Sequence, residues 1–268
     1  MASLRQKRFD GHIVLAGEEA WLPYQRPPLS KKFLAGELPA ERLYFKPPDF
    51  YDAADVDVRL ETRIAAVDRA RRCLLTAAGE RIDYDTLVLA TGSRVRRITV
   101  PGSDLEAVHY LRCIDDVSRI RADLVNSRNV AIIGAGYIGL EVAAVIRELG
   151  HNVSVVEMAD RVMSRVVSPV VSDFYRAEHE ARGVDFVLST TLEAIEGDTR
   201  ASAVRTSGHV SIPADLVIAG IGIVPNTELA AAAGLEVDNG VVVDTHCRTA
   251  DDSIYAVGDC TSHPSSVY

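Results

Sequence analysis

A glycine-rich loop in mid-chain has the residue types and the spacing that binding of a dinucleotide pyrophosphate requires. The loop reads Gly134-Ala135-Gly136-Tyr137-Ile138-Gly139, and it follows an apolar run at residues 129–133 that predicts a buried parallel strand. Gly134 allows a tight turn, Gly136 lets the backbone approach the pyrophosphate, and Gly139 lets the following helix pack closely on the strand. We expect the pyrophosphate at the helix N-terminus, where free N–H groups and the helix dipole favour negative charge.

The elements after the loop complete a dinucleotide-binding unit. Residues 137–149 carry apolar side chains at helical spacing, and residues 152–156 form a second apolar strand that ends at Glu157. A carboxylate at that strand end accepts hydrogen bonds from the adenosine ribose and repels a 2′-phosphate, which favours NADH over NADPH. Arg161 lies close by, where it would either accommodate such a phosphate or be a solvated helix residue. A glycine-rich turn that binds nothing is the alternative for the loop as a whole.

The composition indicates a globular protein and excludes several function classes. Hydrophobic residues make up 47% of the 268-residue chain, which is long enough for two domains of ordinary size. The net charge of -9 argues against nucleic acid, which demands a basic surface, and provides no attraction to an anionic membrane. The longest apolar stretch, residues 130–146, contains the glycine loop and Glu141, so we do not expect it to span a membrane.

The cysteines and the N-terminus bear on metal binding and location. Cys73, Cys113, Cys247 and Cys260 form no C-x-x-C pair, which excludes a local zinc knuckle, an iron–sulfur ligand run and a redox dithiol, so no metal site is predicted. Residues 1–10 are basic and polar rather than apolar, so no signal peptide is predicted. We therefore expect a cytoplasmic protein with reduced, structural cysteines.

The chain divides into three stretches, at residues 1–101, 102–224 and 225–268. The first begins with what we interpret as the last turns of a helix at residues 2–7. It then shows short strand signals at residues 12–16, 56–60, 64–67, 73–76 and 86–90. A polar, proline-rich segment at residues 21–48 interrupts these strands, with Ser30 as the expected N-cap of a short helix.

The second and third stretches continue the alternation of strand and helix that a doubly wound sheet shows. After the glycine loop we expect a helix at residues 169–182, a strand at 184–188 and a small antiparallel excursion over 192–212. The third stretch includes two further predicted strands, at residues 240–243 and 253–257.

Seven motifs in order make the chain resemble the two-dinucleotide flavoprotein reductases. The resemblance is greatest to the ferredoxin reductases that serve cytochrome P450s and ring-hydroxylating oxygenases, a family that includes putidaredoxin, rhodocoxin and rubredoxin reductases. Besides the central loop, the motifs are Gly17-Glu18-Glu19, Pro27-Pro28-Leu29-Ser30-Lys31, Ala90-Thr91-Gly92-Ser93-Arg94, Tyr110-Leu111-Arg112, Gly220-Ile221-Gly222-Ile223-Val224-Pro225-Asn226 and Tyr255-Ala256-Val257-Gly258-Asp259-Cys260.

The resemblance implies an α/β fold with two Rossmann-type domains, in which an NAD-binding domain is inserted in an FAD-binding domain. On this basis residues 1–101 and 225–268 form the FAD-binding domain and residues 102–224 the NAD-binding domain. Full-length members also carry an N-terminal strand with its own glycine loop for FAD and a C-terminal domain over the flavin. We expect that this chain lacks these parts.

The resemblance also implies an FAD site. Glu18 would bind the adenosine ribose, and Ile64 would contact the adenine through its backbone. Lys31 would lie near the flavin N5 and pair with Glu141, and we expect it to be a buried lysine that stays charged because it faces a carboxylate. The alternatives without a cofactor are an ordinary loop acid for Glu18, a strand core residue for Ile64 and a surface residue for Lys31.

Further site residues follow from the remaining motifs. Thr91 and Gly92 would form the turn that leads from the FAD domain toward the NAD domain, and Gly222 belongs to the cofactor-binding set. Arg112 would reach the flavin or its pyrophosphate. Asp259 would bind the ribityl chain, although an acid at such a strand end also caps helices.

The resemblance therefore implies an enzyme that passes electrons from NADH through FAD to a ferredoxin- or rubredoxin-type iron–sulfur protein. Disulfide reductases of this fold place redox-active cysteines after the second strand, and residues 21–31 contain none. Electrons leaving the flavin would then go directly to an external acceptor. A homologue that binds NADH only and catalyses nothing is the alternative, and an assembly in which another chain supplies a strand is a third possibility.

Overall fold

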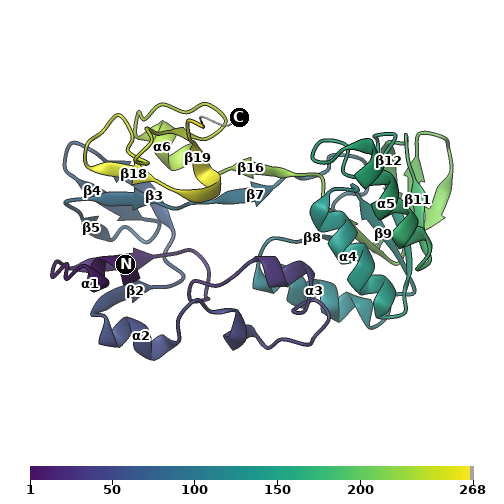
Figure 1. The fold of residues 1–268 in the computed structure, drawn as a ribbon, viewed down its shortest axis with the longest axis horizontal. Helices are drawn as coiled ribbons and strands as arrows, with labels where there is room; N and C mark the ends of the chain where they lie inside the picture. The colour runs from purple at the N-terminus through teal and green to yellow at the C-terminus, as the bar shows by residue number, and fades with distance from the viewer. Residues whose placement is uncertain (266–268) are drawn as a thin grey trace. The chain divides into compact units, whose positions relative to one another are not determined.

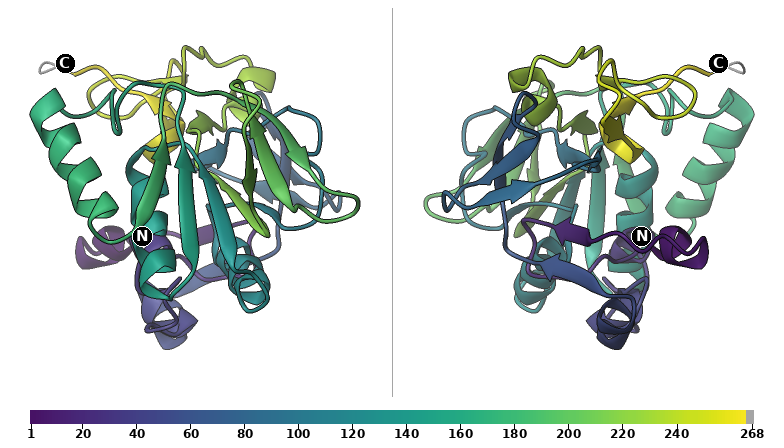
Figure 2. Two further views of the ribbon diagram at one scale, coloured as in Figure 1. Left: turned by 90° about the vertical axis from the view of Figure 1, so that its right-hand side faces the viewer. Right: turned by 90° about the vertical axis from the view of Figure 1, so that its left-hand side faces the viewer.

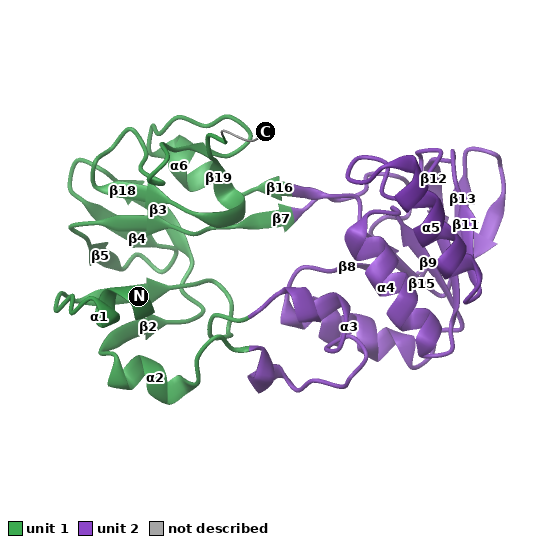
Figure 3. Ribbon diagram, viewed as in Figure 1, with its two compact units in different colours: residues 1–24, 44–94, 224–268 green, residues 25–43, 95–223 purple. Residues whose placement is uncertain are grey.

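The computed structural model describes residues 1–265, and the chain divides into two compact units. Unit 1 comprises residues 1–24, 44–94 and 224–268, and unit 2 comprises residues 25–43 and 95–223 (Figures 1 and 3). The prediction assigned residues 25–43 to the first stretch, whereas the structure groups them with the second unit. Residues 266–268, the end of the predicted third stretch, lie outside the described residues.

Unit 2 is built on a five-stranded parallel sheet in the order β11-β10-β9-β15-β8 (Figure 2, left). Its strands are β8 (Val108–Tyr110), β9 (Asn129–Ile133), β10 (Asn152–Val156), β11 (Val184–Val187) and β15 (Leu216–Ala219). Because β9 and β15 are covered on both faces, they are continuous apolar runs rather than alternating ones. The strands predicted at 129–133 and 152–156 are confirmed residue for residue, and that at 184–188 is one residue shorter.

Three helices connect these strands. They are α3 (Ile114–Leu124), α4 (Tyr137–Glu148) and α5 (Pro169–Glu180). The buried face of α4 includes Val142, Ala143 and Ile146, which lie at the spacing of successive helical turns. The helix stops where Gly150 takes a φ of 96°, the left-handed conformation that commonly ends helices. The helices predicted at 137–149 and 169–182 are thus confirmed, each slightly shorter.

The antiparallel excursion predicted over residues 192–212 is also confirmed. It consists of β12 (Leu192–Glu196), β13 (Ala203–Thr206) and β14 (Ser211–Pro213). Ile195 and Val204 from these strands share a buried cluster with Ala131, Ile133 and Val217 of the parallel sheet. The antiparallel strands therefore pack on the sheet of unit 2 through apolar side chains.

The proline-rich segment of unit 2 contains two short 3-10 helices, η1 (Pro27–Ser30) and η2 (Ala40–Leu43). The prediction that Ser30 caps a helix is wrong, because Ser30 is the last residue of η1. The two prolines fix φ near the helical value and start the turn earlier than expected.

Unit 1 contains several small sheets. Parallel pairs join β1 (Ile13–Ala16) to β2 (Val56–Arg59), β6 (Leu87–Leu89) to β18 (Ile254–Ala256), and β17 (Val241–Val242) to β19 (Thr261–Ser262). Strands β3 (Ile64–Asp68), β4 (Cys73–Thr76) and β5 (Arg81–Asp83) form an antiparallel sheet. The predicted strands of the first and third stretches are confirmed at these positions, with ends that differ by at most one residue.

The remaining elements of unit 1 are short helices, α1 (Ala2–Gln6), α2 (Pro48–Ala53), α6 (Glu228–Ala232) and η3 (Gly258–Cys260). The helical turns predicted at residues 2–7 are confirmed as α1. The chain passes between the units at four places: after residue 24, after residue 43, within β7 (Ser93–Val95) and within β16 (Ile223–Pro225). Within residues 1–265, no helix has the length and apolar character needed to cross a bilayer.

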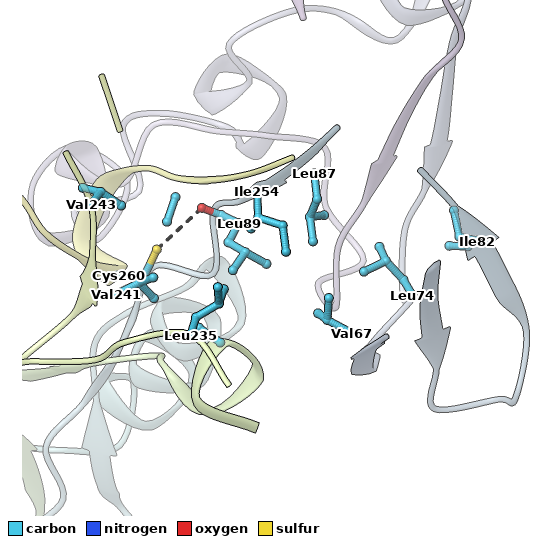
Figure 4. Packing of buried hydrophobic residues seen from close by; sticks show 12 residues of the cluster. Val67, Leu74, Ile82, Leu87, Leu89, Leu235, Val241, Val243, Ile254 and Cys260 are labelled. Carbon is cyan, nitrogen blue, oxygen red and sulfur yellow. Dashed lines mark hydrogen bonds between the residues drawn. The ribbon is translucent and has the colours of Figure 1, made fainter. Parts of the chain in front are cut away.

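A single buried cluster ties the sheets of unit 1 together (Figure 4). Leu87 and Leu89 of β6 pack with Ile254 of β18 and with Val67 of β3. The thiol of Cys260, which is fully buried, lies 3.7 Å from the carbonyl oxygen of Leu89. Each large aliphatic side chain buried in this way contributes about 1.5–3 kcal/mol to folding.

Candidate functional site

The glycine loop lies in unit 2, between the carboxyl end of β9 and the start of α4. Gly134 has a φ of 104°, and a Cβ there would lie 2.7 Å from the carbonyl oxygen of Gly220. A Cβ on Gly139 would lie 2.1 Å from the carbonyl oxygen of Gly134, so only glycine allows this approach of helix and loop. A Cβ on Gly136 would meet nothing within 4 Å. The first and third glycines are thus required by packing, whereas Gly136 leaves open space beside the backbone.

That open space adjoins the N-terminus of α4. Gly136 is the N-cap residue of this 12-residue helix, and no side chain caps it. The first N–H groups of a helix have no partner within the helix, and here they are not taken by a cap. Together with the helix dipole, they form a site suited to a phosphate group. The space at Gly136 and the uncapped helix end fit the pyrophosphate of a dinucleotide.

Glu157 follows the carboxyl end of β10 and faces the same loop. One carboxylate oxygen accepts the N–H of Ala135 at 2.7 Å, and the other accepts the N–H of Ala159 at 2.9 Å. The side chain therefore holds the glycine loop and its own turn in place. A carboxylate has about four lone-pair positions, so two backbone hydrogen bonds leave capacity for ribose hydroxyls. Its role toward the ribose stays a prediction.

Arg161 was considered as a phosphate ligand or a helix residue. It lies in the turn after β10 and in none of the helices, so the helical interpretation is wrong. Its guanidinium donates to the carbonyl oxygens of Ser164 at 2.7 Å and Val167 at 3.0 Å. Because these bonds hold the loop that leads to α5, Arg161 supports the backbone of this turn.

Lys31 and Glu141 form the predicted ion pair, which is confirmed within unit 2. The Lys31 Nζ lies 2.6 Å from Oε2 of Glu141, and the Ser30 hydroxyl donates to the same oxygen at 2.6 Å. The lysine was expected to be buried, but 47% of its side chain is exposed, against 32% for the glutamate. The contact of Ser30, which is 4% exposed, with Glu141 was not predicted, because no local pattern indicates a contact with a residue 111 positions away.

Arg112 and Gly222 follow strand ends of the same unit. The N–H of Arg112 donates to Asp116 at 2.9 Å, and its carbonyl oxygen accepts from Arg26 at 2.6 Å, so its backbone position is well defined. Gly222 has a φ of 110°, and its carbonyl oxygen accepts the N–H of Arg96 at 2.9 Å. Contact of Arg112 and Gly222 with a cofactor stays a prediction.

Unit 1 contains the other predicted site residues, and four of them follow carboxyl ends of parallel strands. Glu18 follows β1 and is exposed, Thr91 and Gly92 follow β6, and Asp259 follows β18. Ligands of parallel α/β sheets bind at such strand ends, so these residues fit a cofactor site. Ile64, by contrast, packs against the buried cluster of unit 1, as a strand core residue would.

Asn226 holds the Thr91-Gly92 turn, a role that was not predicted from the sequence. The Thr91 hydroxyl donates to the carbonyl oxygen of Asn226 at 2.7 Å, and the Asn226 amide donates back to the Thr91 carbonyl oxygen at 2.8 Å. Gly92 has a φ of 63°, which lets the chain turn here. Ser93 then donates its hydroxyl to Asp259 at 3.0 Å. The turn after β6 and the turn after β18 are thereby joined.

Comparison with known proteins agrees with this arrangement. The sequence model described as "Pyridine nucleotide-disulphide oxidoreductase" matches residues 1–268. The chain is 44% identical to the probable ferredoxin reductase CtmF of Castellaniella defragrans, over 99% of this chain and 65% of that protein. It is also 44% identical to a rubredoxin-NAD(+) reductase of Pseudomonas putida, over 96% of this chain and 67% of that protein.

The fold is similar to that of solved structures. The reductase in the covalent putidaredoxin reductase–putidaredoxin complex matches with a TM-score of 0.95 and 42% identity, over 100% of this chain and 66% of that one. The chain thus spans about two thirds of the length of these relatives.

Proposed function

Because the chain belongs to the pyridine nucleotide-disulphide oxidoreductase family, we propose that it passes electrons from NADH through FAD to an iron–sulfur protein. The support is likeness over nearly the whole chain to proteins named as ferredoxin, rubredoxin and putidaredoxin reductases. The partner would be of the ferredoxin or rubredoxin type and would serve a P450 or another oxygenase. The protein would act in the cytoplasm, where its four free cysteines would stay reduced.

The nucleotide would bind at the glycine loop. The N-terminus of α4 would hold the pyrophosphate, and Glu157 would accept hydrogen bonds from the adenosine ribose. A 2′-phosphate would meet the Glu157 carboxylate, so NADH would be preferred to NADPH.

The observation that carries the redox part of the proposal is the ion pair between Lys31 and Glu141. Binding of a dinucleotide alone does not require an ion pair on α4. Glu141 and the Ser30 hydroxyl would keep the ammonium charged and oriented, and a cation beside a flavin favours the reduced form. Bound FAD would supply the exchange between the two-electron chemistry of NADH and the one-electron chemistry of the partner.

The other residues would hold the cofactor. Glu18 would bind the adenosine ribose, Ile64 the adenine, and Asp259 the ribityl chain. Arg112 would contact the flavin or its pyrophosphate. Thr91, Gly92 and Gly222 would shape the backbone around the site. No cysteine lies at residues 21–31, so no thiol would carry electrons between the flavin and the acceptor.

The test is the Lys31→Met variant, with Lys32→Met as a matched control, because the neighbouring Lys32 is also exposed. Loss of one charge-assisted contact corresponds to a decrease of about tenfold or more in the rate of flavin reduction by NADH. Stopped-flow bleaching of the flavin band measures it, and Lys32→Met should reduce at the wild-type rate. Equal rates for Lys31→Met and wild type would contradict the role of Lys31. A colourless protein that binds NADH would support the alternative, a homologue that binds the nucleotide without catalysis.

A further inference from the structure

A cavity of about 610 Å³ lies in unit 2 along β8, an edge strand of the parallel sheet. Its walls come from β8, from α3, and from Arg97 and Arg200 in the segments beside them. No residue of the glycine loop lines it. The volume is within the range that proteins use for small molecules.

A backbone kink builds one wall of the cavity. Ala107, which is 4% exposed, has a φ of 63°, the left-handed conformation that non-glycine residues rarely adopt. Glu106, directly before Ala107, donates its N–H to the carbonyl oxygen of Thr199, and its carbonyl oxygen accepts the N–H of Ala201, each at 3.0 Å. These two bonds fix Arg200, which lies between their partners, beside β8. Strained backbone of this kind persists where the surrounding structure holds it, and it clusters at functional sites.

The two aspartates of the cavity are already neutralised. Asp123 contacts His109 at 2.5 Å and Arg200 at 2.8 Å through different oxygens, and Asp116 contacts Arg119 at 2.6 Å. Burial opposes ionisation of Asp123, but the hydrogen bonds from His109 and Arg200 outweigh it and lower its pKa. Each arginine uses one terminal nitrogen on its aspartate, and a guanidinium has five N–H donors. The cavity therefore has more donors than its own acids occupy.

Arg97 adds a third guanidinium. The Arg97 Cζ lies 4.8 Å from the centre of the Tyr110 ring, and the Tyr110 hydroxyl accepts the N–H of Ile98 at 3.2 Å. Stacking on an aromatic face holds the guanidinium plane without using its N–H donors. Glu106 is the third carboxylate of the lining, and it is exposed. Three guanidinium groups thus line the cavity, while two of its three carboxylates are paired.

We propose that this cavity binds a small, multiply charged oxyanion, a phosphorylated or polycarboxylic metabolite, through Arg97, Arg119 and Arg200. Guanidinium forks match the geometry of phosphate and carboxylate oxygens in pairs, which a single ammonium does not. The protein carries a net charge of -9, so such an anion is attracted by these local donors and not by the protein as a whole.

The experiment is calorimetric titration of the full 268-residue chain with inorganic phosphate and, separately, with citrate, at constant ionic strength set by chloride. We expect saturable binding of at least one probe, and the probe that binds identifies the class of anion. Arg97→Gln should weaken it about tenfold, the loss of one charge-assisted contact. Arg165→Gln is the control, because Arg165 is exposed in the same unit and does not line the cavity.

A second titration in saturating NADH separates this cavity from the helix end at the glycine loop. Binding that persists with NADH and depends on Arg97 supports the proposal. Three results would overturn it: no saturable binding of either probe, equal losses in Arg97→Gln and Arg165→Gln, or abolition of binding by NADH. Within residues 1–265 Arg97 forms no ion pair, so its variant should fold, and thermal unfolding of both variants checks this.

Discussion

Alanine should have different consequences at Gly139 and at Gly136, although both glycines belong to one motif. At Gly139 it should lower stability, and at Gly136 it should weaken nucleotide binding. A Cβ on Gly139 would lie 2.1 Å from the carbonyl oxygen of Gly134, whereas ordinary contact begins at 3.4 Å. Helix and loop would have to separate by more than about 1 Å, against a helix face in which Val142, Ala143 and Ile146 are fully buried. A Cβ on Gly136 would meet nothing within 4 Å.

The magnitudes follow from these contacts. Overpacking of this kind costs about 1–3 kcal/mol. Alanine in a helix recovers about 1 kcal/mol relative to glycine. Gly139→Ala should therefore destabilise the protein by up to about 2 kcal/mol, which lowers Tm by up to roughly 8 °C for a chain of this size. Gly136→Ala loses only the modest preference of an N-cap for glycine, within about 1 kcal/mol, but places a methyl group where the pyrophosphate would approach.

Thermal unfolding and calorimetric titration with NADH together measure both effects. We expect Gly139→Ala to unfold earlier than wild type and Gly136→Ala to unfold close to it with roughly tenfold or more weaker NADH binding. If Gly136→Ala binds NADH as wild type does, the space at Gly136 is not a pyrophosphate site. If Gly139→Ala is as stable as wild type, the close approach of helix and loop is not a packing constraint.

Three further predictions concern specificity, local stability and pH. Glu157→Ala should raise the affinity for NADPH relative to that for NADH roughly tenfold, because the wild-type carboxylate would repel the 2′-phosphate. Equal affinities of the wild type for both nucleotides in titration calorimetry would contradict this. Hydrogen exchange should be slow in β9 and β10, which are mostly buried, and faster in β1. The four residues of β1 are each partly exposed, and among the described strands β1 pairs only with β2. Equal protection of β1 and β9 would refute this. Hydrogen bonds from Ser253 and Arg69 lower the pKa of Asp251 from 3.8 to about 2, so its contribution to stability is present above about pH 4 and lost as the pH falls toward 2. Asp251→Asn should therefore destabilise the protein at pH 7 and much less at pH 2, and a denaturation difference independent of pH would contradict the assignment.

The local elements were predictable because their patterns are local. The buried strands around the glycine loop and the helix between them follow from apolar runs and helical spacing within a few residues, and their positions agree with the structure. The errors arose where a tertiary contact replaced a local preference. Ser30 was expected to cap a helix, but its hydroxyl instead donates to Glu141, on a helix far along the chain.

The sequence by itself determined the glycine loop, the acid at the end of the next strand, the family resemblance and the residues to examine, since these depend on residue type and short spacing. Only the tertiary structure decided which distant groups meet. It brought Lys31 to Glu141, joined Asn226 to Thr91, grouped residues 25–43 with the second unit and gathered three arginines around one cavity. The physical reason is that hydrogen bonds and ion pairs act over a few ångströms in space. Packing of the whole chain, and no short pattern within it, sets which side chains come that close.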